Sequence, residues 1–147
     1  MKTLYYGEHK RHPMGINADL YPNPGVDVVI SETGLPFRAE SFDVVVSNQV
    51  MEHNHFIEDY YREASRVLKP WGFMFLHFPH KFQLYDGHSG RLFLKQKGKG
   101  YNWQSKGYHK RIALKYFAEW VDLQPYWRQV KALVFKNKLF STWVTPI

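Results

Sequence analysis

Polar residues that could contact a ligand follow three short apolar runs, each typical of a β-strand. In an open parallel sheet, ligands bind beyond the carboxyl ends of the strands. A glycine there lets backbone approach a ligand, and a carboxylate can accept hydrogen bonds from the hydroxyls of a sugar. Asp19 could instead cap the turn near Pro22. The candidates are Gly7 and Glu8, then Asp19 and Leu20, and finally Ser47, Asn48 and Gln49.

A metal site is the alternative that the histidines raise. His77, His80 and His88 are close in sequence, but their spacing matches no strong zinc signature. The chain also contains no cysteine, which excludes disulfides, thiol nucleophiles and cysteine-ligated zinc. We therefore expect no metal.

The elements that position these residues alternate between strand and helix. We expect strands at residues 2–6, 16–20, 26–30, 42–46 and 73–78. Apolar residues recur at three- and four-residue spacing over 55–69, which predicts an amphipathic helix. Pro70 is expected to end that helix and Gly72 to turn the chain. The order of elements predicts an α/β fold with a mostly parallel sheet and flanking helices.

The C-terminal part has a different composition. Residues 81–107 are rich in glycine, lysine and aromatic side chains, and we interpret them as a long excursion. A helix is expected over 112–123, followed by strands at 130–135 and 139–144 that could form an antiparallel hairpin around residues 136–138.

Length and charge bound the class of protein. The 147 residues suit one domain, and 44% hydrophobic residues argue against disorder. The net charge of +7 is uneven, since residues 1–86 carry −3 and residues 87–147 carry +10. We find no signal peptide and no apolar run of the roughly 18 residues that a membrane helix needs. A cytoplasmic protein without a membrane partner is expected, with an acidic or phosphorylated partner as one interpretation of the basic part.

An ordered set of short motifs between Gly15 and Pro79 resembles the class I S-adenosylmethionine-dependent methyltransferases, in particular the methyltransferase type 11 group. The resemblance implies a Rossmann-like fold, with residues 1–80 as the cofactor-binding half and 81–147 as the basic, substrate-side half of one domain. The matching pieces are Asn17-Ala18-Asp19-Leu20, Gly25 to Val29, Leu35-Pro36-Phe37, Ser41 to Val45, Val50-Met51-Glu52-His53 and Glu63 to Pro70.

The resemblance implies S-adenosylmethionine as the cofactor. Asp19 would then accept the ribose hydroxyls, and Glu32, next to Ser31, could substitute for the acid that contacts the adenine amine in the family. Ser47, Asn48 and Gln49 correspond to the family's contacts with the methionine half of the cofactor. Glu63 and Arg66 lie three apart on one helix face, so a local ion pair explains them.

Methyl transfer to a hydroxyl also needs a base within hydrogen-bond reach. His80, Asp86 and His88 are the candidates, each with a structural or solvent-exposed role as the alternative. The resemblance implies a small-molecule or sugar-like acceptor.

The first motif departs from the family because the segment Gly7-Glu8-His9 lacks the usual second glycine, and the connection to Ile16 is short. A second hypothesis follows from this departure. The chain could be a catalytically inactive methyltransferase-like module that binds nucleic acid or another polyanion through its basic half, where lysines and arginines interleave with Tyr101, Trp103 and Tyr108.

Overall fold

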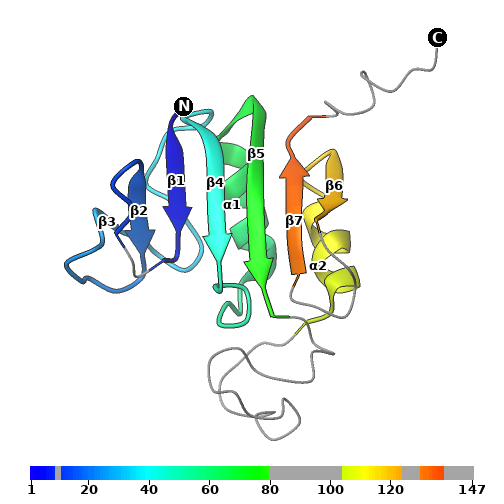
Figure 1. Ribbon diagram of the computed structural model, residues 1–147, viewed down its shortest axis with the longest axis horizontal. Helices are drawn as coiled ribbons and strands as arrows, with labels where there is room; N and C mark the ends of the chain where they lie inside the picture. Colours follow the sequence, from blue (N-terminus) through cyan, green and yellow to red (C-terminus); the bar gives the residue numbers. More distant parts are fainter. Residues whose placement is uncertain (9–10, 80–103, 124–129, 138–147) are drawn as a thin grey trace, which may run out of the picture.

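A computed structural model describes residues 1–8, 11–79, 104–123 and 130–137, and these residues form a seven-stranded sheet with the order β3-β2-β1-β4-β5-β7-β6 (Figure 1). The strands β1 to β5 pair in parallel, whereas β7 is antiparallel to both β5 and β6. The Rossmann-like expectation is confirmed, including antiparallel C-terminal strands. The strands are β1 (Thr3–Tyr6), β2 (Ile16–Asp19), β3 (Val28–Val29), β4 (Phe42–Asn48), β5 (Leu68–Phe78), β6 (Glu119–Asp122) and β7 (Val130–Phe135).

The core lies between one face of this sheet and two helices, α1 (Ile57–Val67) and α2 (Lys106–Ala113), with α1 behind β4 and β5 in Figure 1. Side chains alternate along a strand, so every second residue faces the helices. Val45, Met74 and Leu76 are fully buried on that face. Neither helix in the described ranges is long and apolar enough to span a membrane.

The end of α1 differs from the sequence expectation. The helix ends at Val67, and β5 continues without a turn from Leu68 through Pro70 and Gly72. The expectation that Pro70 ends the helix and that Gly72 turns the chain was wrong. Phe42 pairs with Leu68 and Val44 with Phe73, so the extra residues of β5 form an irregularity. Proline is tolerated in a strand at such a point because no regular ladder hydrogen bond is lost there.

Two further elements were misplaced by the sequence analysis. The expected buried strand at 26–30 is reduced to the two-residue β3 at the sheet edge, where Val29 is 53% exposed. The expected helix at 112–123 was also wrong, because α2 ends at Ala113, and Trp120 and Val121 lie in β6. Aromatic and β-branched residues suit a strand that pairs with β7. The expected strand at 139–144 lies outside the described residues.

The start of α2 is fixed by a side-chain cap. The Ser105 hydroxyl accepts a hydrogen bond from the backbone N–H of Tyr108 at 3.1 Å. This contact satisfies one of the N–H groups that a helix start leaves without an intrahelical partner. The basic excursion of the sequence analysis therefore ends earlier than residue 107.

Residues 11–15 of the short connection between β1 and β2 are held against the sheet. The His12 ring stacks on Tyr5 with the ring centroids 3.8 Å apart. Asn17 is 1% exposed and its side chain accepts from the His12 N–H at 2.9 Å, while its amide donates to Asp27 at 2.8 Å. The hydrogen bonds that the side chain and the backbone N–H of Asn17 donate to Asp27 lower the pKa of that carboxyl. The abbreviated crossover is thus tied down by specific polar contacts.

Glu63 and Arg66 do more than form the local ion pair that the sequence predicted. Glu63 accepts from the Leu35 N–H at 2.9 Å, and Arg66 donates to the carbonyl oxygens of Leu35 and Phe37 at 2.9 and 2.8 Å. The two side chains also bind each other, and the Arg66 hydrogen bond is the main cause that lowers the pKa of Glu63. The pair therefore fastens α1 to the loop before β4.

Replacing Glu63 with glutamine is expected to lower the free energy of unfolding by about 1–3 kcal/mol, because Arg66 loses its charge-assisted hydrogen bonds at a mostly buried site. Asp59→Asn is the matched control, because it removes the more exposed ion pair with Arg62, which has the same three-residue spacing. That change should cost less than about 1 kcal/mol. Urea unfolding at neutral pH measures both, and equal losses would contradict the fastening role.

Candidate functional site

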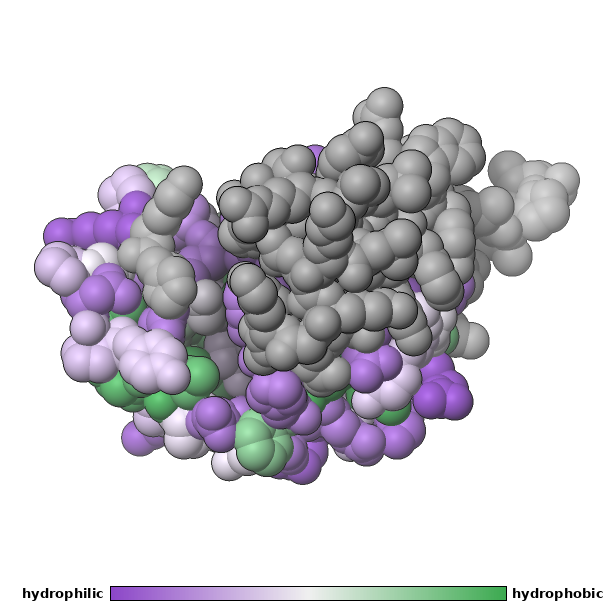
Figure 2. All heavy atoms as spheres, turned by 90° about the horizontal axis from the view of Figure 1, so that it is seen from below, coloured by the Kyte–Doolittle hydropathy of each residue, from purple (hydrophilic) through white to green (hydrophobic). Residues whose placement is uncertain are grey.

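The carboxyl ends of the parallel strands bring together most of the described candidate residues. The sheet order places β1 between β2 and β4, so the chain changes direction across the sheet between β1 and β4. Such a switch point is where open α/β sheets bind ligands. The parallel strands of Figure 1 point down to this edge, and Figure 2 views it from below, where the described surface is mainly hydrophilic.

Gly7 makes the turn that leaves β1 at this edge. Its φ of +85° is in the left-handed region that glycine favours. Its N–H donates to the Ala18 carbonyl at 2.7 Å, which holds the turn against the end of β2. A Cβ at position 7 would lie 2.7 Å from Cγ1 of Val50. The glycine therefore lets the loop after β4 approach the first turn.

Glu8 follows that turn and is 7% exposed. Its carboxylate contacts Nε2 of His12 in the same loop. The structure thus places Glu8 in an internal contact that closes the loop. His9 stands where the family motif has its second glycine, and it lies outside the described residues.

Asp19 ends β2 next to this turn and is 3% exposed. Its Oδ1 accepts a hydrogen bond from the Tyr21 N–H at 3.2 Å, as a turn-capping carboxylate would. Leu20, the next residue, is 36% exposed. Glu32 is exposed in a tight turn closed by a bridge between Ser31 and Gly34. Asp19 is thus a buried acid at the end of β2, whereas Glu32 lies in the turn beyond β3.

Ser47, Asn48 and Gln49 take different positions at the end of β4. Ser47 is 1% exposed, and its hydroxyl lies 2.9 Å from the Tyr60 hydroxyl, which also contacts the Tyr6 carbonyl at 2.7 Å. Burial raises the pKa of Tyr60 well above its usual value, so this phenol is a neutral core group. Ser47 therefore joins β4 to α1 on the helix side.

Asn48 and Gln49 lie at the edge itself, together with His77 of β5. Asn48 Oδ1 is 2.7 Å from His77 Nδ1, and Gln49 donates its backbone N–H to the His77 carbonyl at 2.7 Å. Gln49 has a φ of +56°, an uncommon value for a residue other than glycine. Sequence reasoning considered His77 only as a metal ligand. An imidazole at the end of the apolar run Phe73–Phe78 was the signal that could have indicated this role.

One matching motif, Val50–His53, and the three base candidates remain. Glu52 is 2% exposed and lies 3.8 Å from Nε2 of the exposed His53, on the loop after β4. His80, Asp86 and His88 lie outside the described residues. Across the described ranges, no three histidine, aspartate or glutamate side chains are grouped as a metal site would require.

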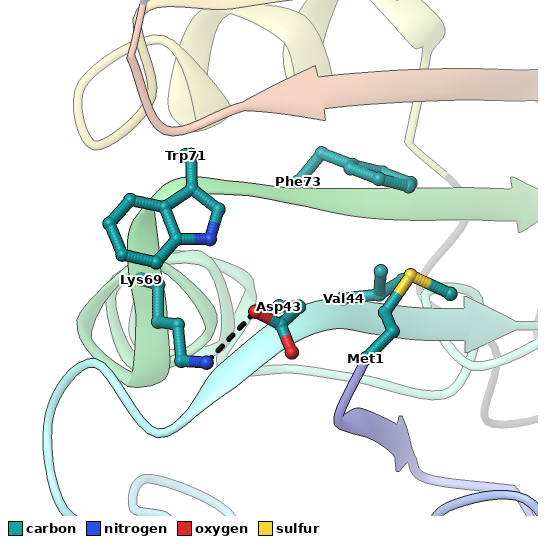
Figure 3. Close-up of a pocket in the computed structure, with 6 residues that line it drawn as sticks. All are labelled: Met1, Asp43, Val44, Lys69, Trp71 and Phe73. Atoms are coloured by element: carbon teal, nitrogen blue, oxygen red, sulfur yellow. Dashed lines mark hydrogen bonds and ion pairs between the residues drawn. The ribbon is translucent and has the colours of Figure 1, made fainter.

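A surface pocket opens at the opposite, amino end of the parallel strands (Figure 3). In it, Lys69 forms an ion pair with Asp43 at 2.9 Å and lies over the Trp71 ring at 5.8 Å. Hydrogen bonds from the Lys2 N–H and from Lys69 lower the pKa of Asp43 to about 2. The pocket is remote from the carboxyl edge, and Asp43 is engaged in holding the strand starts together.

Solved structures with a similar fold include several methyltransferases. One from Thermotoga maritima is 16% identical with a TM-score of 0.68, and the match covers 92% of this chain and 82% of that one. A methyltransferase from Haloferax volcanii, in complex with the Trm112 activator, is 12% identical with a TM-score of 0.62 and the same coverage. One from Bacillus halodurans is 18% identical with a TM-score of 0.64, covering 84% of this chain and 64% of that one.

These likenesses define a class I methyltransferase fold. The family described as "Methyltransferase domain" matches residues 13–76, which confirms the resemblance found in the sequence. No curated protein matches the chain. S-adenosylmethionine is the cofactor that the family match implies. The donor set fits it, because a buried carboxylate beside a glycine turn suits paired hydroxyls, and the amides of Asn48 and Gln49 suit a polar amino-acid group.

Proposed function

We propose that this protein transfers a methyl group from S-adenosylmethionine to a small-molecule or sugar-like acceptor. The observation that carries the proposal is the buried Asp19 at the end of β2, directly beside the left-handed turn at Gly7. The Gly7 N–H bonds to Ala18, so the turn and the carboxylate are held as one unit at the switch point of the sheet.

The cofactor supplies an electrophilic methyl group, and the chain supplies position. Asp19 accepts hydrogen bonds from the ribose hydroxyls, and the turn at Gly7 brings backbone close to the ligand. Asn48 and Gln49 orient the methionine half, while Ser47 supports them from the core. Alignment of the reacting atoms can account for about 7–11 kcal/mol of the barrier, so few catalytic groups are needed.

S-Adenosylhomocysteine is expected to bind the wild-type protein in isothermal titration calorimetry, and Asp19→Asn should weaken this binding about 10- to 100-fold. This fold-change corresponds to the loss of about 1.5–3 kcal/mol that hydrogen bonds to a charged group contribute. Glu40→Gln is the control, because it makes the same carboxylate-to-amide change at an exposed site beyond the amino end of β4.

The melting temperature of each variant shows whether it is folded. No heat and no thermal shift with millimolar ligand on the wild-type protein would overturn the proposed function. Equal weakening by both variants would remove Asp19 from the ribose site. The described residues give the polyanion hypothesis no support, because residues 80–103 of the basic half lie outside them and Lys106 pairs with Asp122 at 3.3 Å.

A further inference from the structure

His77 stands one strand beyond the switch point, at the carboxyl end of β5. It pairs in register with Asn48, the last residue of β4, and is only partly buried. Neighbouring strands are about 4.8 Å apart, so its imidazole lies close to the edge at which the cofactor is proposed to bind. In the strand order it stands on the side of the switch point away from Asp19.

The contact with Asn48 defines which imidazole nitrogen is basic. An amide oxygen can only accept a hydrogen bond, so Nδ1 of His77 carries the proton in the 2.7 Å contact with Asn48 Oδ1. Nε2 then holds the lone pair of the neutral ring. A hydrogen bond that fixes one nitrogen of a histidine as donor is the arrangement that orients a general base.

Gln49 completes this arrangement from the loop after β4. Its side-chain Nε2 lies 3.5 Å from Nε2 of His77, longer than a typical hydrogen bond. Its backbone holds the His77 carbonyl despite the left-handed φ of +56°. Such strained residues cluster at functional sites, where the surrounding structure maintains them.

We propose that Nε2 of His77 is the general base that takes the proton from a hydroxyl or amine acceptor, with Asn48 as its positioning residue. This inference rests on the proposed function. The acceptor lone pair forms the new bond to the methyl carbon, and the carbon–sulfur bond breaks with its electrons left on sulfur. The acceptor proton passes to Nε2 and leaves to water after product release. The substrate class is therefore a protic acceptor.

Charged groups near His77 affect its titration. On β7, Lys131 pairs with His77 in register and so extends from the same face of the sheet. On β4, the corresponding neighbour is the uncharged Asn48. Among the described residues of these two flanking strands, Lys131 is the charged residue in register with His77, and its contribution stays constant across the ligands compared below.

The test is ¹⁵N-histidine NMR of the wild-type protein, free and with two ligands. One ligand is S-adenosylhomocysteine, and the other is the analogue that carries an amino group in place of the methylsulfonium. The His77 signals are assigned by their loss in His77→Gln, and the exposed His55→Gln is the matched control. We expect the Nδ1–H tautomer in the neutral free protein and its loss in Asn48→Ala. The titration midpoint of His77 should be lower by about half a pH unit with the amine analogue than with S-adenosylhomocysteine.

Other results would overturn the proposal in distinguishable ways. An Nε2–H tautomer, or equal His77 titration with both ligands, would remove His77 as the base and leave the proposed function intact. A more than tenfold loss of S-adenosylhomocysteine binding in a folded His77→Gln protein would make His77 a cofactor contact instead. Failure of the wild-type protein to bind either ligand would overturn the proposed function, and this proposal with it.

Discussion

A Gly72→Ala protein is expected to lose about 3 kcal/mol of its free energy of unfolding, a loss at the upper end for overpacking a buried site. A Cβ at this position would lie 2.8 Å from Cδ2 of Leu68, 2.9 Å from the Asp43 carbonyl and 3.0 Å from the Lys69 carbonyl. Two of these three atoms belong to the backbone, so they cannot move aside by a change of rotamer.

The reason lies in the irregular start of β5. Gly72 is buried where β5 lies beside the start of β4. Its carbonyl accepts a hydrogen bond from the Lys136 N–H at 3.2 Å. A shift of Gly72 would therefore disturb both neighbouring strands. Trp71, next to it, is 60% exposed, so its side chain should not add to the clash.

Gly107→Ala is the matched control for this prediction. Gly107 lies within α2, and the nearest atom to a Cβ there is Ser105 Oγ at 3.9 Å. Alanine is favoured over glycine by about 0.5–1 kcal/mol in a helix interior, so a smaller stabilisation is expected at this second residue of α2. Urea unfolding of the two variants should thus give changes of opposite sign. A Gly72→Ala protein as stable as the wild type would show that the strand starts are not packed as described.

The strands of the N-terminal half could be predicted from sequence because their signals are local. Thr3–Tyr6, Ile16–Asp19 and Phe42–Asn48 are short apolar or β-branched runs with clear boundaries, and α1 has helical spacing. Leu68–Phe78 was only half recognised. Proline and glycine in that segment are local signals for a break, but pairing with β4 and β7 stabilises the strand across them.

The C-terminal half could not be predicted in the same way. Leu114, Phe117, Trp120 and Val121 have helical spacing, yet the chain leaves the helix after Ala113, and β6 pairs with β7. Whether a short segment of mixed spacing forms a helix or a strand depends on its tertiary pairing, and the local sequence pattern does not contain that information.

The candidate site, too, could be predicted only in part from local sequence features. Residues at strand ends, such as Asp19 and Asn48, could be found because a strand end is a local feature. The contact between Asn48 and His77 joins residues 29 positions apart and depends on the register of two strands. Glu8 and Ser47 lie near strand ends, as the sequence predicts, but their partners His12 and Tyr60 could only be seen in the folded structure.

The second large effect is a loss of stability in weak acid caused by His109. This residue of α2 is 1% exposed, and its Nδ1 lies 3.1 Å from the Tyr61 hydroxyl of α1. Its ring packs on Phe78 with centroids 4.3 Å apart. Burial lowers the pKa of His109 from 6.5 to about 3, so the folded protein keeps it neutral.

The sign of the pH dependence follows from that lowered pKa. Below pH 6.5 the unfolded chain binds a proton at His109 that the folded protein does not, so stability falls as the pH falls. One pH unit corresponds to about 1.4 kcal/mol, so about 2 kcal/mol should be lost between pH 6.5 and 5. The lowered pKa values of Glu63 and Asp43 affect the stability only below about pH 4.5. Above that pH, both carboxylates are ionised in the folded and in the unfolded protein.

Urea unfolding of the wild-type protein at half-unit steps from pH 7.5 to 5 measures this loss. His109→Phe should abolish the slope, although it will start from a lower stability because the Tyr61 hydroxyl is left buried without its partner. Tyr61→Phe keeps the buried imidazole and should keep the slope, so the comparison survives if the first variant folds poorly. His55→Gln, at an exposed site, should behave as the wild type. A flat wild-type profile over this range would mean that α2 opens and lets His109 be protonated before the sheet unfolds.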